Sequence, residues 1–281
     1  MDNGTFSPTE EGTPQGGVIS PLLANIALHG MEKVIWDYAN SVKKKKTYYK
    51  RGLVIIRYAD DFVILHPDHK VVEECLEVID EWLTGMGLEL KPSKTKIVHT
   101  FDGFDFLGFN IRQYKVGKNH SRQGFKTIIK PSKEAILEHY GQLSEAINKH
   151  RAAPQEALIS HLKPIIKGWC NYYRSVCSQE TFDDLGNMLW NKLQRWGYRR
   201  HPNKSKSWVV KKYWGTIGED KWTFMTGKDN YLPKHAKTEI IRHVKVKESR
   251  SPYDGDLIYW GTRMRKHPEM TTRKGRLLER Q

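Results

Sequence analysis

The chain has 281 residues, 38% hydrophobic and 11% aromatic, which is enough to bury a core and excludes a wholly disordered polymer. Its three scattered cysteines, Cys75, Cys170 and Cys177, form no C-x-x-C pair, so a disulfide framework is excluded and a zinc module is disfavoured. We expect a reducing, cytosolic setting. The first 20 residues lack a signal-peptide pattern, and the longest apolar stretch, residues 18–28, is too short to span a bilayer.

The formal net charge of +15 is concentrated in one part of the chain. Residues 1–110 carry 12 Lys and Arg and 16 Asp and Glu, a net charge of −4, whereas residues 111–281 carry 35 and 16, a net charge of +19. Basic side chains among aromatic ones suit phosphate contacts and base stacking, so the second part predicts a polyanionic partner. A solvated loop is the alternative for the lysine run at 43–46. The aromatic residues of the basic part include Trp169, Tyr172, Tyr173, Trp190, Trp196, Tyr198, Trp208, Tyr213, Trp214 and Trp222.

The first part of the chain predicts helices and strands in alternation. Ser20, as N-cap, and Pro21, at the first helical position, begin a helix that continues to Ala39. A charged connector at 43–51 leads to two apolar strands around residues 60 and 61. Helical spacing of apolar residues then predicts an amphipathic helix at 69–86, with an inner face of Val72, Leu76, Ile79 and Leu83 and a stop at Gly85 and Gly87.

Short strands are expected next, at 88–90, 95–99 and 104–112, which gives this part an α+β pattern. From about residue 132 the pattern becomes helical. Three helices with short links, at 132–149, 154–177 and 179–199, predict a small bundle. The composition loosens after residue 200, where Lys, Arg, Gly and Pro are frequent, and the last residues are basic with helical character near the end.

Asp60 and Asp61 lie between two apolar runs that are typical of buried strands. Two carboxylates about 4 Å apart repel by roughly 4 kcal/mol at an effective dielectric constant of about 20. An exposed turn screens that repulsion, and double aspartates are common in turns, so one interpretation is purely structural. A divalent cation would instead convert the pair into a ligand set, and two Mg²⁺ ions can activate a 3′-hydroxyl and hold a leaving pyrophosphate.

Three further stretches have both an ordinary and a functional interpretation. The Pro-Gln-Gly-Gly turn at 14–17 is an ordinary turn before a helix, or it lets a nucleotide or template base approach the backbone. Lys94 follows a turn and is either solvated or directed at a phosphate. Gly108 lies inside an apolar stretch, which indicates a bulge or a close backbone approach.

Taken in order, these stretches resemble the reverse transcriptase and maturase proteins encoded by group II introns, of the bacterial or organellar kind. The matching pieces are "PQGGVISPLLANI", "YADD", "GLELKPSKTKIV", "FLGF" and "GWCNYYR" at 168–174, and the resemblance covers most of the chain. Retron and retroviral polymerases share a Tyr-x-Asp-Asp hairpin. The last piece discriminates, because it is similar to the maturase, or X, domain, which acts as the polymerase thumb and helps to bind intron RNA.

The resemblance implies an α+β fold in three parts. Residues 1–118 would form a partial reverse transcriptase palm, with antiparallel strands, a YADD hairpin and packed helices. Residues 119–200 would form a three-helix thumb or maturase domain. Residues 201–281 would form a basic, loosely structured segment that resembles a DNA-binding segment.

The resemblance also assigns site residues. Asp60 would be a catalytic metal ligand and Asp61 its less direct partner in a two-metal Mg²⁺ site. Tyr58 would lie near the primer end, Lys94 near the nucleotide triphosphate, and Trp169 and Tyr172 in the packing of the thumb. The other assignments are Gln15, Gly16 and Gly17 in the nucleotide and template pocket, Leu107 and Gly108 in the primer grip, and Asn171, Tyr173, Arg174, Arg199 and Arg200 on an RNA-binding thumb.

The implied function is RNA-directed DNA synthesis, together with assistance to intron splicing and mobility. The implied partners are intron RNA, an RNA template with a DNA primer, target DNA and deoxynucleoside triphosphates, and no membrane. The implied location is the bacterial cytoplasm, in association with the nucleoid, or an organellar matrix.

The sequence departs from the resembled family at one point that matters. There, a further metal-binding aspartate comes from an earlier palm strand, and only Asp2 precedes "GTPQGG" here. We therefore expect an N-terminally truncated form, inactive alone, with an incomplete metal site and an exposed apolar face, whose fingers a separate N-terminal fragment would have to supply. The chain also stops where the paired cysteines of an HNH endonuclease would begin. The alternatives are a non-catalytic RNA- or DNA-binding fragment and a non-functional remnant.

Overall fold

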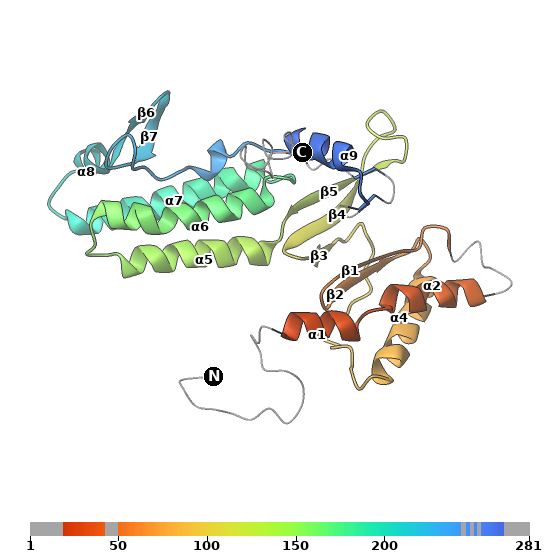
Figure 1. Ribbon diagram of the computed structural model, residues 1–281. Helices are drawn as coiled ribbons and strands as arrows, with labels where there is room; N and C mark the ends of the chain where they lie inside the picture. The colour runs from red at the N-terminus through yellow and green to blue at the C-terminus, as the bar shows by residue number, and fades with distance from the viewer. Residues whose placement is uncertain (1–18, 43–49, 243–245, 248–249, 252–253, 267–281) are drawn as a thin grey trace, which may run out of the picture. The chain divides into compact units, whose positions relative to one another are not determined.

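The computed structural model describes residues 19–42, 50–242, 246–247, 250–251 and 254–266, and it separates into two compact units, Met1–Ile240 and Ile241–Gln281. The described residues form helices and three small antiparallel sheets (Figure 1). This confirms the predicted α+β fold class. None of the described helices is both long and apolar enough to cross a membrane.

Two helices replace the single helix predicted after residue 20. They are α1 (Ser20–Ala27) and α2 (Met31–Ser41), and they are separated because Gly30 adopts a φ of 97°, which interrupts the helical path. The predicted serine cap is wrong, since Ser20 is already helical and the N-cap position falls on Ile19. The inner face of α2 is buried at Met31, Ile35 and Ala39.

α4 (His69–Thr84) confirms the predicted amphipathic helix with a shifted inner face. The side chain of Asp68 caps it by accepting a hydrogen bond from the backbone N–H of Lys70. The sequence predicts Val72 and Leu76 on the inner face, but that face begins one residue earlier because Cys75 is fully buried and packs as a small apolar side chain. The buried residues are Val71, Cys75, Ile79 and Leu83.

β1 (Val54–Tyr58) and β2 (Asp61–Leu65) form an antiparallel hairpin. One face joins the core of α2 and α4 through Ile55, Phe62 and Ile64. The opposite face leaves Val54 42% and Ile56 48% exposed. The strands predicted at 88–90 and 95–99 are wrong, because neither stretch pairs with another strand in the described structure.

β3 (Phe104–Phe106), β4 (Phe109–Lys115) and β5 (Phe125–Pro131) form a second antiparallel sheet in that order. The sequence predicts one strand over 104–112. The chain instead reverses at Leu107 and Gly108, whose φ angles are 51° and 77°. The irregularity predicted at Gly108 is therefore a two-residue hairpin turn.

Three helices form the predicted bundle: α5 (Lys133–Lys149), α6 (Gln155–Tyr173) and α7 (Gln179–Arg200) (Figure 1). Their bounds agree with the prediction except that α6 ends at Tyr173 rather than at residue 177. Ser132 caps α5 by accepting a hydrogen bond from the backbone N–H of Ala135. The core is largely aliphatic and includes Leu143, Leu158, Ile159, Leu162, Ile166, Phe182 and Leu189.

The segment that follows the bundle is more ordered than the loose tail predicted from residue 201. α8 (Lys206–Tyr213), β6 (Trp214–Ile217) and β7 (Asp220–Phe224) share one hydrophobic core with the bundle. Large rings explain the difference, because each removes about 150–250 Å² from water when buried. The core residues from this segment are Val209, Tyr213, Trp214, Phe224 and Leu232.

A buried histidine pair fastens the short 3₁₀ helix η1 (His235–Lys237) to α5. The Nε2 atoms of His139 and His235 lie 2.9 Å apart, so one ring donates to the other. Burial, helped by His235, lowers the pKa of His139 to about 3, and burial lowers the pKa of His235 to about 4. Both rings are therefore neutral at pH 7, and their Nδ1 atoms are buried without a hydrogen-bond partner among the described residues.

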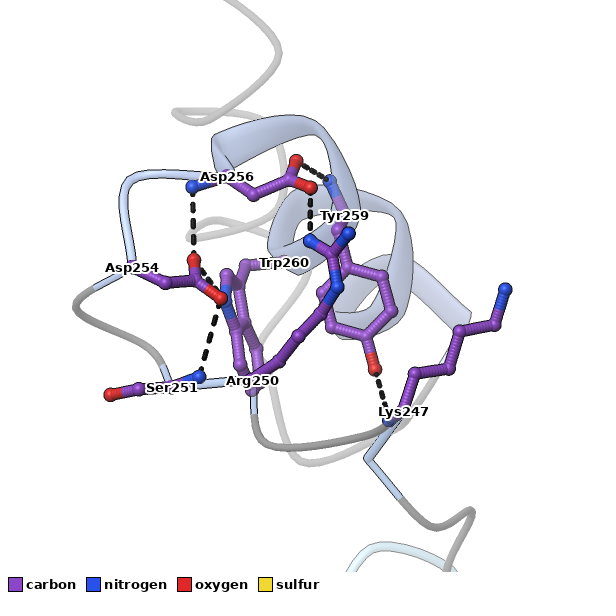
Figure 2. A network of polar contacts seen from close by, with 7 residues as sticks. All are labelled: Lys247, Arg250, Ser251, Asp254, Asp256, Tyr259 and Trp260. Carbon is purple, nitrogen blue, oxygen red and sulfur yellow. Dashed lines mark hydrogen bonds and ion pairs between the residues drawn. The ribbon is translucent and has the colours of Figure 1, made fainter.

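The second unit contains α9 (Leu257–Lys266), whose start is fixed by a polar network (Figure 2). The carboxylates of Asp254 and Asp256 accept the hydrogen bonds of this network. These bonds lower the pKa of both carboxyl groups, and the largest contribution to each shift comes from a backbone N–H donor. The donors are the backbone N–H groups of Ser251, Asp256 and Tyr259, the Trp260 indole and the Arg250 guanidinium.

The packing of α8 on α7 predicts a large cost for Gly197→Ala. A Cβ atom at Gly197 would lie 2.8 Å from Cγ1 of Val209 and 3.4 Å from the ring of Tyr213, both buried. We expect the free energy of unfolding to fall by about 1–3 kcal/mol, as is usual for overpacking. Urea unfolding followed by circular dichroism measures it.

Gly186→Ala on the same helix is the matched control, because a Cβ there meets nothing within 4 Å. That change should be neutral or should stabilise by up to about 1 kcal/mol, since alanine favours helix over glycine. Equal effects of the two substitutions would contradict this account of the contact.

The histidine pair predicts a loss of stability in mild acid. Both pKa values are lowered in the folded state, so below pH ~6.5 the unfolded chain binds more protons than the folded one. The two histidines contribute fully to the free energy of unfolding above that pH. The contribution is lost as pH falls toward 4, and the loss at pH 5 is at most about 2 kcal/mol per histidine. Urea unfolding at pH 7.5 and pH 5 should show a smaller difference for His235→Gln than for the wild type. The exposed His120→Gln is the control, and parallel pH profiles for wild type and His235→Gln would refute the prediction.

Candidate functional site

The two aspartates lie at the turn of the β1–β2 hairpin. Tyr58 and Asp61 form the last cross-strand pair, which leaves Ala59 and Asp60 as a two-residue turn. Ala59 has a φ of 54°, which costs a residue other than glycine about 1 kcal/mol. Both carboxylates are exposed. The hairpin therefore presents two adjacent carboxylates to solvent from a tight turn.

Asp61 and Tyr58 share one face of the hairpin, because directly opposed residues of antiparallel strands project to the same side. Ile56 lies on that face too, and the face is turned away from the packed core. Tyr58 is 65% exposed. Its ring and the Asp61 carboxylate are thus accessible to a large ligand.

Arg57 braces this turn, a role that the sequence analysis does not identify. Its Nη1 donates to the carbonyl oxygen of Ala59 at 2.9 Å and to Oδ1 of Asn25 at 3.2 Å. Its Nε lies 3.4 Å from Oε1 of Glu32, an ion pair that lacks hydrogen-bond geometry. The side chain is only 14% exposed, and it links the turn to α1 and α2. The signal in the sequence is an arginine inside an otherwise apolar strand.

The donor chemistry of Asp60 and Asp61 fits part of a Mg²⁺ site. Mg²⁺ prefers carboxylate oxygens and takes one or two carboxylates from a protein, with water and substrate phosphates as the remaining ligands. Among the residues that the structure describes, no group of three or more His, Cys, Asp or Glu side chains is placed to hold a metal ion. The two aspartates are thus a pair there and not a complete ligand cage.

Of the residues assigned to contact the nucleotide, the structure describes some and not others. Lys94 is exposed at the end of a turn in which its backbone N–H donates to the carbonyl of Lys91. Gln15, Gly16 and Gly17 lie outside the described residues. Their assignment to the nucleotide and template pocket stays a prediction.

The Leu107–Gly108 turn is held by two adjacent tyrosines of α6. The hydroxyl of Tyr172 donates to the carbonyl of Leu107 at 3.0 Å, and that of Tyr173 donates to the carbonyl of Gly108 at 3.2 Å. The Phe109 ring lies 5.1 Å from both tyrosine rings. Tyr173 is 4% exposed, and burial, with smaller contributions from neighbouring groups, raises its pKa to about 12. The structure thus brings together the residues assigned to the primer grip and two aromatic residues of the thumb.

The residues assigned to an RNA-binding thumb have different environments. Asn171 and Arg199 are exposed, and Arg174 is half-buried. Arg200 makes intramolecular contacts. Its guanidinium donates to the carbonyls of Arg151 and Ala153, 2.7 Å and 3.0 Å away, and it lies over the Trp196 ring. Arg200 and the buried Tyr173 therefore support the fold, whereas Asn171 and Arg199 are available to a ligand.

Comparison with protein families assigns both parts of the chain. Residues 1–111 match the reverse transcriptase (RNA-dependent DNA polymerase) family, so the aspartate hairpin lies within a polymerase-type domain. Residues 136–214 match the maturase-specific domain of group II introns, which includes most of the helix bundle. Together the two matches cover most of the chain.

Individual relatives agree with these matches. The group II intron-encoded protein LtrA of Lactococcus lactis subsp. cremoris is 24% identical over 90% of this chain and 53% of its own length. Protein YkfC of Escherichia coli is 33% identical over 46% of this chain and 38% of its own length. A 91 kDa protein in the cob intron of Schizosaccharomyces pombe is 26% identical over 61% of this chain and 29% of its own length. The chain spans about half, or less, of the length of these relatives. It belongs to the family of group II intron reverse transcriptases and maturases.

The contact between the turn and Tyr173 predicts that Gly108→Ala is unusually costly. Gly108 has a φ of 77°, and a Cβ there would lie 2.7 Å from the Tyr173 hydroxyl oxygen. Gly124→Ala is the matched control, with a φ of 76° and nothing within 4 Å of the added atom. We expect about 1 kcal/mol of destabilisation at Gly124 and about 1–3 kcal/mol more at Gly108. Chemical unfolding of the two variants gives the difference.

The same contact is tested by a double-mutant cycle with Tyr173→Phe, which removes the hydroxyl and keeps the ring. The additional cost of Gly108→Ala should shrink in that background, because the closest atom is gone. Additive effects of the two changes would show that the hydroxyl does not limit the space at the turn.

Proposed function

We propose that this protein is an RNA-directed DNA polymerase of a group II intron that also assists intron RNA splicing and mobility. The observation that carries the proposal is the exposed Asp60–Asp61 pair on the β1–β2 turn, within a segment that matches reverse transcriptases. Two accessible carboxylates on a braced turn suit a reaction in which metal-bound phosphates must enter from solution.

Asp60 and Asp61 would hold Mg²⁺, which would supply activation of a primer 3′-hydroxyl and stabilisation of the leaving pyrophosphate. The protein's own contribution is positioning. Arg57 fixes the turn through the Ala59 carbonyl, and Tyr58 places an exposed ring beside Asp61 for the primer end or the nucleotide. Lys94, exposed at its turn, would contact the triphosphate.

The Leu107–Gly108 turn would act as the primer grip and the α5–α7 bundle as the thumb. The two tyrosine hydrogen bonds support this pairing, since they couple the turn directly to α6. Intron RNA and target DNA would bind the basic part of the chain, residues 111–281, with its net charge of +19. We propose the domain bounds 1–118, 119–200 and 201–281 for palm, thumb and DNA-binding-like segment.

A non-catalytic role in binding RNA or DNA is the second candidate. It is favoured by the same basic charge and by exposed thumb residues such as Arg199. Binding alone does not separate the two candidates, because both predict it, whereas Mg²⁺-dependent extension of a primer does. A bacterial cytoplasm or an organellar matrix suits either function.

We expect residues 1–281 alone to extend a DNA primer on an RNA template weakly or not at all. The described part of the chain offers a pair of carboxylates, and family members add a third from an earlier strand. Adding the N-terminal part of a related reverse transcriptase in trans should restore synthesis. Asp60→Ala/Asp61→Ala should then abolish it, by at least about 1000-fold, since the metal ligands are lost.

The adjacent aspartates Asp183 and Asp184 on α7 provide a control with the same change of charge, and their double alanine variant should keep the restored synthesis. Robust cDNA synthesis by the chain alone would refute the expected inactivity. Unchanged synthesis by the Asp60→Ala/Asp61→Ala variant would refute the site assignment.

A further inference from the structure

The end of α7 and all of α8 form a basic surface without neighbouring acidic residues in the sequence. Residues 185–218 contain eight Lys and Arg and no Asp or Glu. None of these eight side chains is ion-paired with a carboxylate in the described part of the chain. This positive charge has no direct carboxylate partner among the described residues, which favours a polyanionic ligand.

An exposed indole belongs to this surface. Trp208 of α8 is 38% exposed, although most of the neighbouring rings are buried. The ammonium groups of Lys204 and Lys212 lie 5.5 Å and 5.1 Å from the centre of its ring. The His201 ring lies 4.9 Å away, edge-on. The surface thus combines an aromatic face with two adjacent cations.

The position of Trp208 is fixed by its surroundings. Ser205 caps α8 by accepting a hydrogen bond from the backbone N–H of Trp208. The next residue, Val209, is fully buried against Gly197 of α7. His201 is held by a 2.8 Å hydrogen bond to the hydroxyl of the buried Tyr213. A ring on such a rigid base loses little freedom when a ligand stacks on it.

The pKa of His201 also indicates a positive environment around Trp208. Partial burial and then the positive charges of Lys212, Arg200 and Lys204 lower the pKa of His201. No carboxylate contributes to the shift. A histidine that senses three cations and no anion lies in a positive potential that an incoming phosphate would relieve.

We propose that Trp208, Lys204 and Lys212 form a stacking site for one base of a single-stranded nucleic acid. The base would cover the indole, and the two lysines would leave the ring and bind the flanking phosphates. An exposed cation–π contact is weak, so this exchange is easy. The site rests on the proposed nucleic-acid-binding function and names one place where it occurs.

Single strands are the ligand that suits this site, because a duplex hides its base faces and offers only its backbone. Base stacking on an exposed aromatic ring is tolerant of sequence, since every base has a π face. Basic residues alone would bind any polyanion. The exposed indole predicts a preference for strands with accessible bases over polyanions without bases.

The test measures binding of residues 1–281 to a labelled oligouridylate of about twelve nucleotides by fluorescence anisotropy. Trp208→Ala should weaken binding by about 5-fold to 100-fold, the range for loss of one stacked base. Inorganic polyphosphate, which carries charge but no bases, should bind the variant and the wild type equally. Oligothymidylate and a duplex of the same length show whether the site distinguishes RNA from DNA and single strands from double strands.

Four variants control this experiment. Trp222→Ala removes another exposed indole, 55% exposed on β7, and should bind like the wild type. Trp208→Phe keeps an aromatic face and should retain most of the affinity, which protects the test against misfolding of the alanine variant. Lys204→Gln/Lys212→Gln should weaken both oligouridylate and polyphosphate and reduce the salt slope for the single strand by about 1.4, whereas Lys50→Gln/Lys70→Gln in the acidic part should not.

Each outcome decides between the proposals. Wild-type affinity in Trp208→Ala, or equal losses in Trp208→Ala and Trp222→Ala, would overturn the stacking site and leave the proposed function intact. No binding of oligouridylate by the wild type would overturn both. The result that establishes the site is a loss of oligouridylate binding in Trp208→Ala while polyphosphate binding is unchanged.

Discussion

The hydroxyl groups of Tyr172 and Tyr173 hold the Leu107–Gly108 turn and so join the β3–β4 hairpin to α6. The turn contacts α6 through these groups, and the backbone N–H of Ser132, which caps α5, donates to the Gly108 carbonyl. The polymerase match ends at residue 111 and the maturase match begins at 136, yet side chains from both parts form one packed layer here. A boundary drawn from sequence families therefore crosses a continuous contact between the two matched segments.

In the basic part of the chain, residues 111–281, aromatic and basic side chains differ in how far they are buried. Several of its rings are buried: Tyr173, Trp196, Tyr213 and Trp214 are at most 6% exposed, and the last two let the segment after the bundle fold against it. The cations stay outside, where solvent screens them. Among the described residues of this part, the large exposed rings are those of Tyr114, Tyr172, Trp208, Trp222 and Tyr231. The composition is consistent with rings that pack in the core and with rings that contact a ligand. The packing of each ring shows which of these roles it can have.

Much of the fold could be predicted from the sequence where the pattern is long. The three bundle helices have strong periodicity, and their bounds agree within a few residues except at the end of α6. The failures are short elements. Gly30 divides α1 from α2, and the strand predicted over 104–112 turns back at Gly108, because a positive φ at a single position changes the path of the chain. Of the candidate site, "YADD" predicted the turn, but the bracing by Arg57 depends on Asn25 and Glu32, which lie 25 to 32 residues away in the sequence.

The described residues other than glycine with positive φ are Ala59 and Leu107, one in each hairpin turn of the candidate site. Glycine at either position would relieve about 1 kcal/mol of backbone strain. A selection for thermal stability alone would therefore favour replacements at these two turns early. Because both turns belong to the candidate site, stabilised variants of this protein need to be checked for changes at these two residues before they are used.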